Sequence, residues 1–151
     1  LALAAALDSG FSEACMVAAR QLTPAEAVAL GFHLAQPPAG FTESWSQLTA
    51  QAASPACADP PPPTYAFYWT FSDGGDLGIG ASLSRDGGGG GGGGVGVAPP
   101  GGGGGPDWLA WTDAEGTSYA VYGYSSSGGP GPAEELLVAV ARSMDPSFGG
   151  L

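Results

Sequence analysis

Two aromatic-rich stretches, each broken once by an acidic turn, constrain the fold of this chain more than any other feature. The first spans residues 65–83 and turns at residues 73–76, which read DGGD; the second spans residues 108–124 and turns at residues 113–116, which read DAEG. Aromatic and β-branched residues favour strands, and Asp and Gly supply turn conformations. Each stretch therefore predicts a β-hairpin, and the two hairpins predict one antiparallel sheet.

The first hairpin has one face that is suited to burial. Because side chains alternate along a strand, the aromatic residues of the outgoing strand share a face with the aliphatic residues of the returning strand. That face holds Tyr65, Phe67, Trp69, Phe71, Leu77, Ile79, Ala81 and Leu83. We expect Trp108 and Trp111 of the second hairpin on the same side, in a closed core or in the lining of an apolar ligand cavity.

A helix is predicted after the hairpins, starting at Pro132 and ending before Pro146. Acidic residues stand at its start and Arg142 stands near its end, as the helix dipole favours. Four apolar residues recur at helical spacing and form one stripe: Leu137, Val140, Ala141 and Met144. We expect this stripe to pack on the aromatic face, so its members join the candidate core or ligand-contact residues.

The N-terminal part of the chain contains a capping box. Thr23 is the predicted N-cap, with Pro24 at the first helical position and Glu26 as the capping partner, which predicts a helix from Pro24 to Leu30. Helix-forming residues over Ser12–Leu22 predict a second short helix. The apolar run at residues 1–7 fits either the end of a signal or anchor or a short alanine-rich helix.

Glycine and proline mark where the core cannot be. Gly87–Gly94 and Gly101–Gly105 have no side chains to bury, and residues 51–64 form a proline-rich connection. Strands are expected at Phe41–Leu48 and, between the glycine tracts, at Val95–Ala98.

The predicted architecture is a single α+β domain over residues 23–146. It has an antiparallel sheet of about five or six strands, the C-terminal helix on one face, and one or two short N-terminal helices. Residues 1–22 are expected to form a helical segment or the remnant of an anchor or signal. Residues 51–64 and 87–105 hold the loops, and residues 147–151 form a tail.

The charge balance excludes two classes of partner. Three Arg and no Lys stand against fourteen acidic residues, for a formal net charge of −11. Nucleic acid and anionic membrane surfaces are bound by clustered cationic side chains, which this chain lacks. We therefore expect a protein partner or an apolar small molecule.

The sequence contains no recognisable catalytic, cofactor-binding or metal-binding motif. His33 is the single histidine, and the two cysteines, Cys15 and Cys57, follow no zinc-site spacing. A phosphate-binding loop of the P-loop type requires Lys, which is absent. We expect a non-enzymatic protein without cofactor or metal. The cysteines fit a disulfide in an oxidising compartment or two thiols, and the sequence leaves both open.

Three segments carry a resemblance to a known group of domains. They are PPAGF at residues 37–41, LAW with a TSYAVYG return at residues 109–123, and EELLVAVARSM at residues 134–144. In this order they resemble an uncharacterised bacterial extracytoplasmic domain, distantly related to the MucB/RseB sigma-regulatory proteins and the LolA lipoprotein carriers, over roughly residues 23–146. The resemblance implies a half-open antiparallel sheet cupping a helix, outside the cytoplasm and often behind a membrane anchor. The polyglycine tracts depart from this pattern.

Two functions are compatible with these observations. The first, which we prefer, is an extracytoplasmic sensor or protein-interaction domain linked to a membrane-anchored regulator. The second is a carrier that binds an apolar ligand between the sheet and the C-terminal helix. Tight packing between helix and sheet favours the sensor, whereas a pocket of a few hundred cubic ångströms between helix and sheet favours the carrier.

Overall fold

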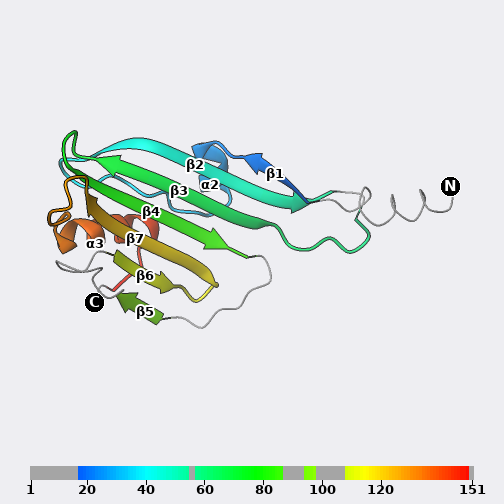
Figure 1. The fold of residues 1–151 in the computed structure, drawn as a ribbon. Coiled ribbons are helices and arrows are strands. Elements are labelled where there is room, and N and C mark those ends of the chain that lie inside the picture. The colour runs from blue at the N-terminus through cyan, green and yellow to red at the C-terminus, as the bar shows by residue number, and fades with distance from the viewer. Residues whose placement is uncertain (1–16, 55–56, 87–93, 98–107, 150–151) are drawn as a thin grey trace.

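The computed structural model of this chain describes residues 17–54, 57–86, 94–97 and 108–149 (Figure 1). The strands are β1 (Val17–Gln21), β2 (Thr42–Ala53), β3 (Thr64–Ser72), β4 (Leu77–Arg85), β5 (Gly94–Val97), β6 (Trp108–Thr112) and β7 (Thr117–Ser125). The helices in these ranges are α2 (Pro24–Ala29) and α3 (Glu134–Met144). All seven strands form one antiparallel sheet in the order β1-β2-β3-β4-β7-β6-β5, and both helices lie behind it in Figure 1. The predicted α+β class is confirmed.

Both predicted hairpins are present. β3 pairs with β4 around residues 73–76, and β6 pairs with β7 around residues 113–116. In each turn, one carboxylate oxygen of the leading aspartate, Asp73 or Asp113, accepts hydrogen bonds from two backbone N–H groups of its own turn. Gly74 and Gly116 have φ angles of 84° and 85°, a region that favours glycine. The acidic residues therefore shape the reversals between the strands.

Residues Val17–Gln21 form strand β1, so the prediction of a helix over Ser12–Leu22 is wrong for this segment. β1 pairs with the end of β2, from Val17 opposite Ala53 to Gln21 opposite Thr49. Helix propensities differ by less than about 1 kcal/mol per residue, so the backbone partners along the edge of β2 override them. The remainder of the predicted helix, residues 12–16, lies outside the described residues.

The other predicted elements are found with small shifts at their ends. β2 continues to Ala53, so the proline-rich connection begins later than expected. β5 covers Gly94–Val97, which confirms the short strand between the glycine tracts, while Ala98 lies outside the described residues. Cys57 in the connection is buried and disulfide-bonded, and Cys15 lies outside the described residues.

Helix α2 begins at the predicted capping box. The Thr23 hydroxyl accepts a hydrogen bond from the N–H of Glu26 at 3.1 Å, and the Glu26 carboxylate accepts one from the N–H of Thr23 at 2.9 Å. The helix ends at Ala29, and Gly31 follows with a φ of 96°. After the helix, the chain crosses the sheet and buries Phe32 against its aromatic residues, at 4.8 Å between the ring centroids of Phe32 and Phe67.

The sheet has two faces of different composition. We name the side that α2, α3 and residues 32–41 cover the inner face. Its buried residues form the core together with the helices: Phe67, Trp69, Phe71, Ile79, Ala81, Leu83, Leu109, Trp111, Tyr119 and Val121. We name the opposite side the open face; neither described helix covers it, and it turns toward the viewer in Figure 1.

Candidate functional site

Side chains fill the space between α3 and the sheet. The predicted stripe of α3 is buried, with Leu137, Val140 and Ala141 at 0% exposure and Met144 at 1%. Val121 of β7, the strand against which α3 packs, is also at 0%. The place that the sequence suggested for an apolar ligand is therefore a packed core.

The candidate core and ligand-contact residues divide into three groups. Tyr65 is half-buried at the border of a hollow described below. Trp108 lies on the open face and is 40% exposed, so the prediction that it shares a face with Trp111 is wrong. The two residues are three apart in one strand, and an odd spacing places side chains on opposite faces. The buried members are Phe67, Trp69, Phe71, Trp111, Leu137, Val140 and Met144.

A hollow of about 640 Å³ lies on the inner face, between β1, the end of β2, the start of β3 and the end of α2. We name it the alanine-lined hollow. Its lining consists of small or apolar residues with one charged residue among them: Ala18, Arg20, Leu22, Leu30, Ala50, Ala52, Ala53, Ser54, Pro63 and Tyr65.

Small side chains on neighbouring strands create this hollow. On the inner face, Ala18 of β1 stands opposite Ala52 of β2, and Arg20 stands opposite Ala50. An alanine side chain ends at Cβ, so this part of the sheet cannot fill the space beneath the end of α2 as the phenylalanine and tryptophan side chains do further along. Leu30, at the C-cap of α2, lines the same space.

An ion pair lies at the rim of the alanine-lined hollow. A guanidinium nitrogen of Arg20 is 2.8 Å from a carboxylate oxygen of Glu26, which links β1 to the first turn of α2. The hydrogen bond from Arg20, followed by the one from the backbone of Thr23, lowers the pKa of Glu26 from 4.5 to about 2. The one charged group in the lining therefore already has a partner within the protein.

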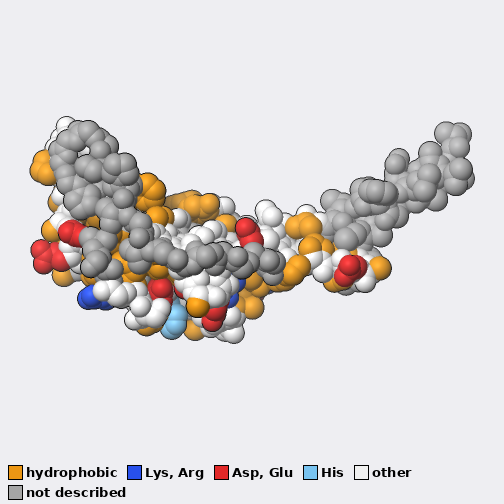
Figure 2. Space-filling model, turned by 90° about the horizontal axis from the view of Figure 1, so that it is seen from below, with side chains coloured by type: hydrophobic (Ala, Val, Ile, Leu, Met, Phe, Trp, Pro, Cys, Tyr) orange, Lys and Arg blue, Asp and Glu red, His pale blue; other side chains and the backbone are white. Residues whose placement is uncertain are grey.

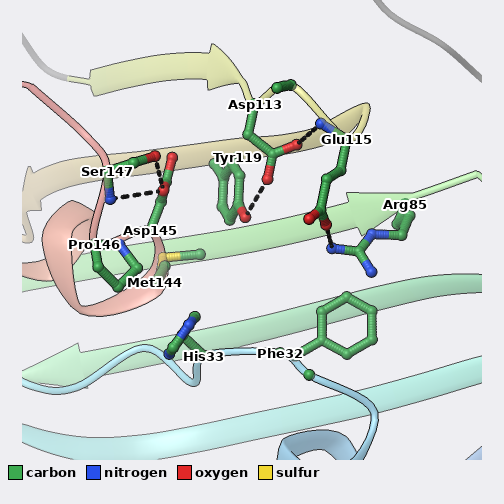
Figure 3. Close-up of a pocket in the computed structure, with 12 residues that line it drawn as sticks. Phe32, His33, Arg85, Asp113, Glu115, Tyr119, Met144, Asp145, Pro146 and Ser147 are labelled. Carbon is green, nitrogen blue, oxygen red and sulfur yellow. Dashed lines mark hydrogen bonds and ion pairs between the residues drawn. The ribbon is translucent and has the colours of Figure 1, made fainter.

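A second pocket, of about 340 Å³, lies between residues 31–33, residues 113–115 and the end of α3 (Figure 3). Its lining mixes polar and apolar side chains, and its acidic side chains are engaged within the protein. Asp113 accepts a hydrogen bond from the Tyr119 hydroxyl at 2.9 Å. Asp145 accepts one from the Trp111 indole N–H at 2.9 Å and one from the Ser147 hydroxyl at 2.6 Å.

The remaining polar groups of this pocket also hold neighbouring segments together. Arg85 contacts Glu115 at 3.1 Å, donates to the Thr117 hydroxyl at 2.6 Å, and lies with its guanidinium 4.4 Å from the centroid of the Phe32 ring. Burial, and then the hydrogen bond to Asp113, raise the pKa of Tyr119, so its hydroxyl keeps its proton. These groups join the second hairpin to the chain around it.

The described residues form no metal-binding site. No three His, Cys, Asp or Glu side chains gather there in a way that could hold an ion. His33, the single histidine of the chain and pale blue on the surface in Figure 2, is exposed and lines the second pocket without a metal-ligating partner group among the described residues (Figure 3).

Known proteins offer no relative from which a function could be taken. No protein-family model, no curated protein and no solved structure matches this chain. Within the described ranges, no helix has the length and apolar character needed to cross a membrane. The resemblance to extracytoplasmic regulatory and carrier domains stays a prediction, and the site has to be interpreted from its own residues.

The alanine-lined hollow was missed from the sequence because its walls come from separate segments. One signal was present: Ala50 and Ala52 alternate with polar residues in a run that extends the strand predicted at Phe41–Leu48. Extending that strand to Ala53 places both alanines on one face. The pairing of β1 with this run, which completes the floor, could not be read from local pattern.

Proposed function

We propose that this protein is a non-enzymatic binding domain that holds an apolar, aliphatic chain in the alanine-lined hollow. The observation that carries the proposal is the hollow itself, about 640 Å³ in volume, with apolar side chains in most of its lining. Pockets for small ligands typically have roughly 300–1,000 Å³ and are mainly apolar. The carrier hypothesis is thereby kept, with its site moved from α3 to β1, β2 and α2.

The chemical composition of the lining favours a flexible aliphatic chain over a compact polar ligand. Ala18, Ala50 and Ala52 form a floor without hydrogen-bonding side chains, and Leu30 and Tyr65 line the space as larger groups. Such a surface gains free energy by releasing water from both partners, at about 25 cal/mol for each Å² of apolar area buried. It offers no donor or acceptor array that would select a polar ligand.

Affinity is expected to come from the chain of the ligand and not from its head group. Arg20 is paired with Glu26, and the two side chains are 63% and 42% exposed. Exposed ion pairs contribute roughly 0–1 kcal/mol, so exchanging Glu26 for a ligand carboxylate gains little. A fatty acid and the corresponding fatty alcohol should bind with similar affinity.

A location outside the cytoplasm is part of the proposal. Cys57 is disulfide-bonded, and disulfides persist mainly in oxidising compartments. Binding of an apolar chain is compatible with both a sensor and a carrier, because each needs a ligand site. In the sensor, the occupied domain reports to a membrane-anchored regulator; in the carrier, it delivers the ligand.

The proposal is tested by filling the hollow with one side chain. In Ala18→Trp the indole takes up the space of the ligand, whereas in Ala19→Trp the same side chain is added to the neighbouring exposed residue of β1, which does not line the hollow. Binding of dansyl-labelled undecanoic acid, followed by fluorescence, should weaken at least about tenfold in Ala18→Trp and stay unchanged in Ala19→Trp. Circular dichroism checks that both variants are folded.

Chain length provides a second measurement on the unmodified protein. Each buried methylene contributes about 0.8 kcal/mol, so shortening a competing fatty acid by two methylenes should raise its Kd about 15-fold. If the parent shows no saturable probe fluorescence, or if both tryptophan variants bind as the parent does, the alanine-lined hollow is not a ligand site.

A further inference from the structure

The open face of the sheet carries exposed aromatic rings. Five large side chains on this face are between 40% and 49% exposed: Trp45, Tyr68, Trp108, Tyr122 and Tyr124. The other open-face positions of β2, β3, β4, β6 and β7 are serine, threonine, glutamine, alanine or glycine. Contiguous exposed apolar patches on a protein surface can mark interaction sites or ligand-binding grooves.

Charged residues are excluded from the open face. The charged residues of the strands are Arg20, Glu43 and Arg85, and their cross-strand partners are the inner-face residues Ala50, Phe71 and Tyr65. The serine hydroxyl at position 46, opposite an inner-face tryptophan, donates to Glu43, which agrees with this placement. In a chain with a formal net charge of −11, the described strand residues thus place no formal charge on the open face.

Two of the rings lie across the sheet instead of standing out from it. Gly80 stands opposite Tyr122, and Gly78 stands opposite Tyr124. A Cβ atom at either glycine would overlap the ring of its partner, and both glycines are buried beneath these rings. The tyrosines therefore cover the backbone of β4 and offer ring faces to the solvent.

Three of the rings, those of Trp45, Tyr122 and Trp108, belong to a row that crosses five strands. Trp45, Thr70, Gly80, Tyr122 and Trp108 are cross-strand neighbours in turn. Four spacings of about 4.8 Å between adjacent strands separate the backbones of the two tryptophans by about 19 Å. Contact with the whole row requires an elongated ligand several rings long.

A neutral sugar chain is chemically complementary to this face. The C–H groups on the faces of a pyranose ring stack on exposed tryptophan and tyrosine rings, whose flat amphipathic surfaces suit such contacts. The hydroxyl group of Ser82, the cross-strand neighbour of Tyr68, can exchange hydrogen bonds with sugar hydroxyls. The absence of charged side chains matches a ligand without charge.

Other occupants fit this face less well. A second copy of the chain would bring together two molecules that each carry a net charge of −11, and like charges repel. Peripheral membrane binding combines apolar residues such as Trp, Phe or Leu with Lys or Arg that attract anionic lipids, and the described open-face positions hold no cationic side chain.

We propose that the open face binds a neutral, linear polysaccharide laid along the row from Trp45 to Trp108. This face lies on the opposite side of the sheet from the alanine-lined hollow. The inference therefore stands independently of the ligand proposed for that hollow.

Affinity electrophoresis of the full chain tests the proposal directly. The chain migrates rapidly in a native gel because of its net charge of −11, so retention by a polymer in the gel is easily measured. Hydroxyethylcellulose should retain the protein, and carboxymethylcellulose, which has the same backbone with anionic groups, should retain it less. Trp108→Ala and Trp45→Ala, at the two ends of the row, should each weaken retention by hydroxyethylcellulose at least about tenfold.

Val28→Ala is the control for loss of exposed apolar surface away from the open face, since Val28 is 56% exposed on α2. It should be retained as the parent is. The proposal is overturned if hydroxyethylcellulose does not retain the parent, or if both aromatic variants, shown to be folded by circular dichroism, are retained like the parent. A concentration-dependent dimer in sedimentation that Trp108→Ala abolishes would assign the face to self-association instead.

Discussion

Trp111 is the residue at which the contributions of packing and of hydrogen bonding to stability can be measured separately. Its ring is 5% exposed, stacks on Tyr119 with 4.9 Å between centroids, and contacts Phe148 at 4.5 Å. Its indole nitrogen donates to Asp145 at 2.9 Å. Two substitutions remove these contacts in different combinations.

Trp111→Ala removes both kinds of contact. Truncation of a buried tryptophan costs about 3–5 kcal/mol, and leaving the buried carboxylate of Asp145 without this donor costs about 1–3 kcal/mol more. Natural domains are stable by only about 5–15 kcal/mol, so the variant should be close to unfolding. Trp111→Phe keeps one aromatic ring in the core and removes the N–H donor with part of the indole, so we expect a smaller loss than in Trp111→Ala, with about 1–3 kcal/mol of it from the lost donor.

Equilibrium unfolding in urea provides the measurement. With a slope of about 2 kcal/mol per molar urea, a loss of 2 kcal/mol lowers the midpoint by about 1 M. Trp108→Ala is the matched control, because Trp108 stands in the same strand but is exposed, and surface substitutions usually change stability by less than about 0.5 kcal/mol. If Trp111→Ala and Trp108→Ala shift the midpoint equally, Trp111 does not contribute to the core. If Trp111→Phe keeps the parent midpoint, its hydrogen bond does not stabilise the fold.

Three further substitutions test separate features. Leu137→Asp places a carboxylate in the fully buried stripe of α3, so far-UV circular dichroism should show loss of the fold, and a folded variant would contradict a sealed core. The lowered pKa of Glu26 stabilises the fold above about pH 4.5, and this contribution should be lost as the pH falls towards about 2. In Glu26→Gln, the free energy of unfolding should therefore depend less on pH in this range. An unchanged slope between pH 4.5 and 2 would refute this prediction. Gly80→Ala should displace the ring of Tyr122 and cost about 1–3 kcal/mol of stability. Gly129→Ala is the control, because a Cβ has room there, and it should leave the thermal midpoint near that of the parent. Equal midpoints for the two variants would mean that the Tyr122 ring moves aside freely.

The elements that were predicted correctly are those whose signals lie within a few residues. The capping box at Thr23 and Glu26 forms both of its hydrogen bonds, and both acidic turns reverse the chain where their Asp and Gly residues stand. The stripe of α3 was found because its spacing depends on one helix alone. Local chemistry was sufficient in each of these cases.

The features that were missed depend on partners far away in the sequence. β1 is a strand because β2 offers it an edge, and this pairing also builds the floor of the alanine-lined hollow. The open face was missed for a different reason. Trp108 was grouped with Trp111 as an aromatic residue, although strict alternation along β6 already separates the two. Its cross-strand neighbour Tyr122, and the glycine beneath that ring, become visible only with the register.

The order of strands divides the sheet into two meanders that meet along a single seam. β1 to β4 each pair with their neighbours in sequence, as do β5 to β7, and only the pairing of β4 with β7 joins the two groups. That seam runs from Leu77 opposite Ser125 to Arg85 opposite Thr117, and side chains on both faces fix its register. In the sequence, the stretch between β4 and β5 consists mostly of glycine. Because the entropy of chain closure changes slowly with length, by about 0.6 kcal/mol for a doubling, we expect that glycines can be added to or removed from this stretch over evolutionary time while the pairing of β4 with β7 keeps both meanders aligned.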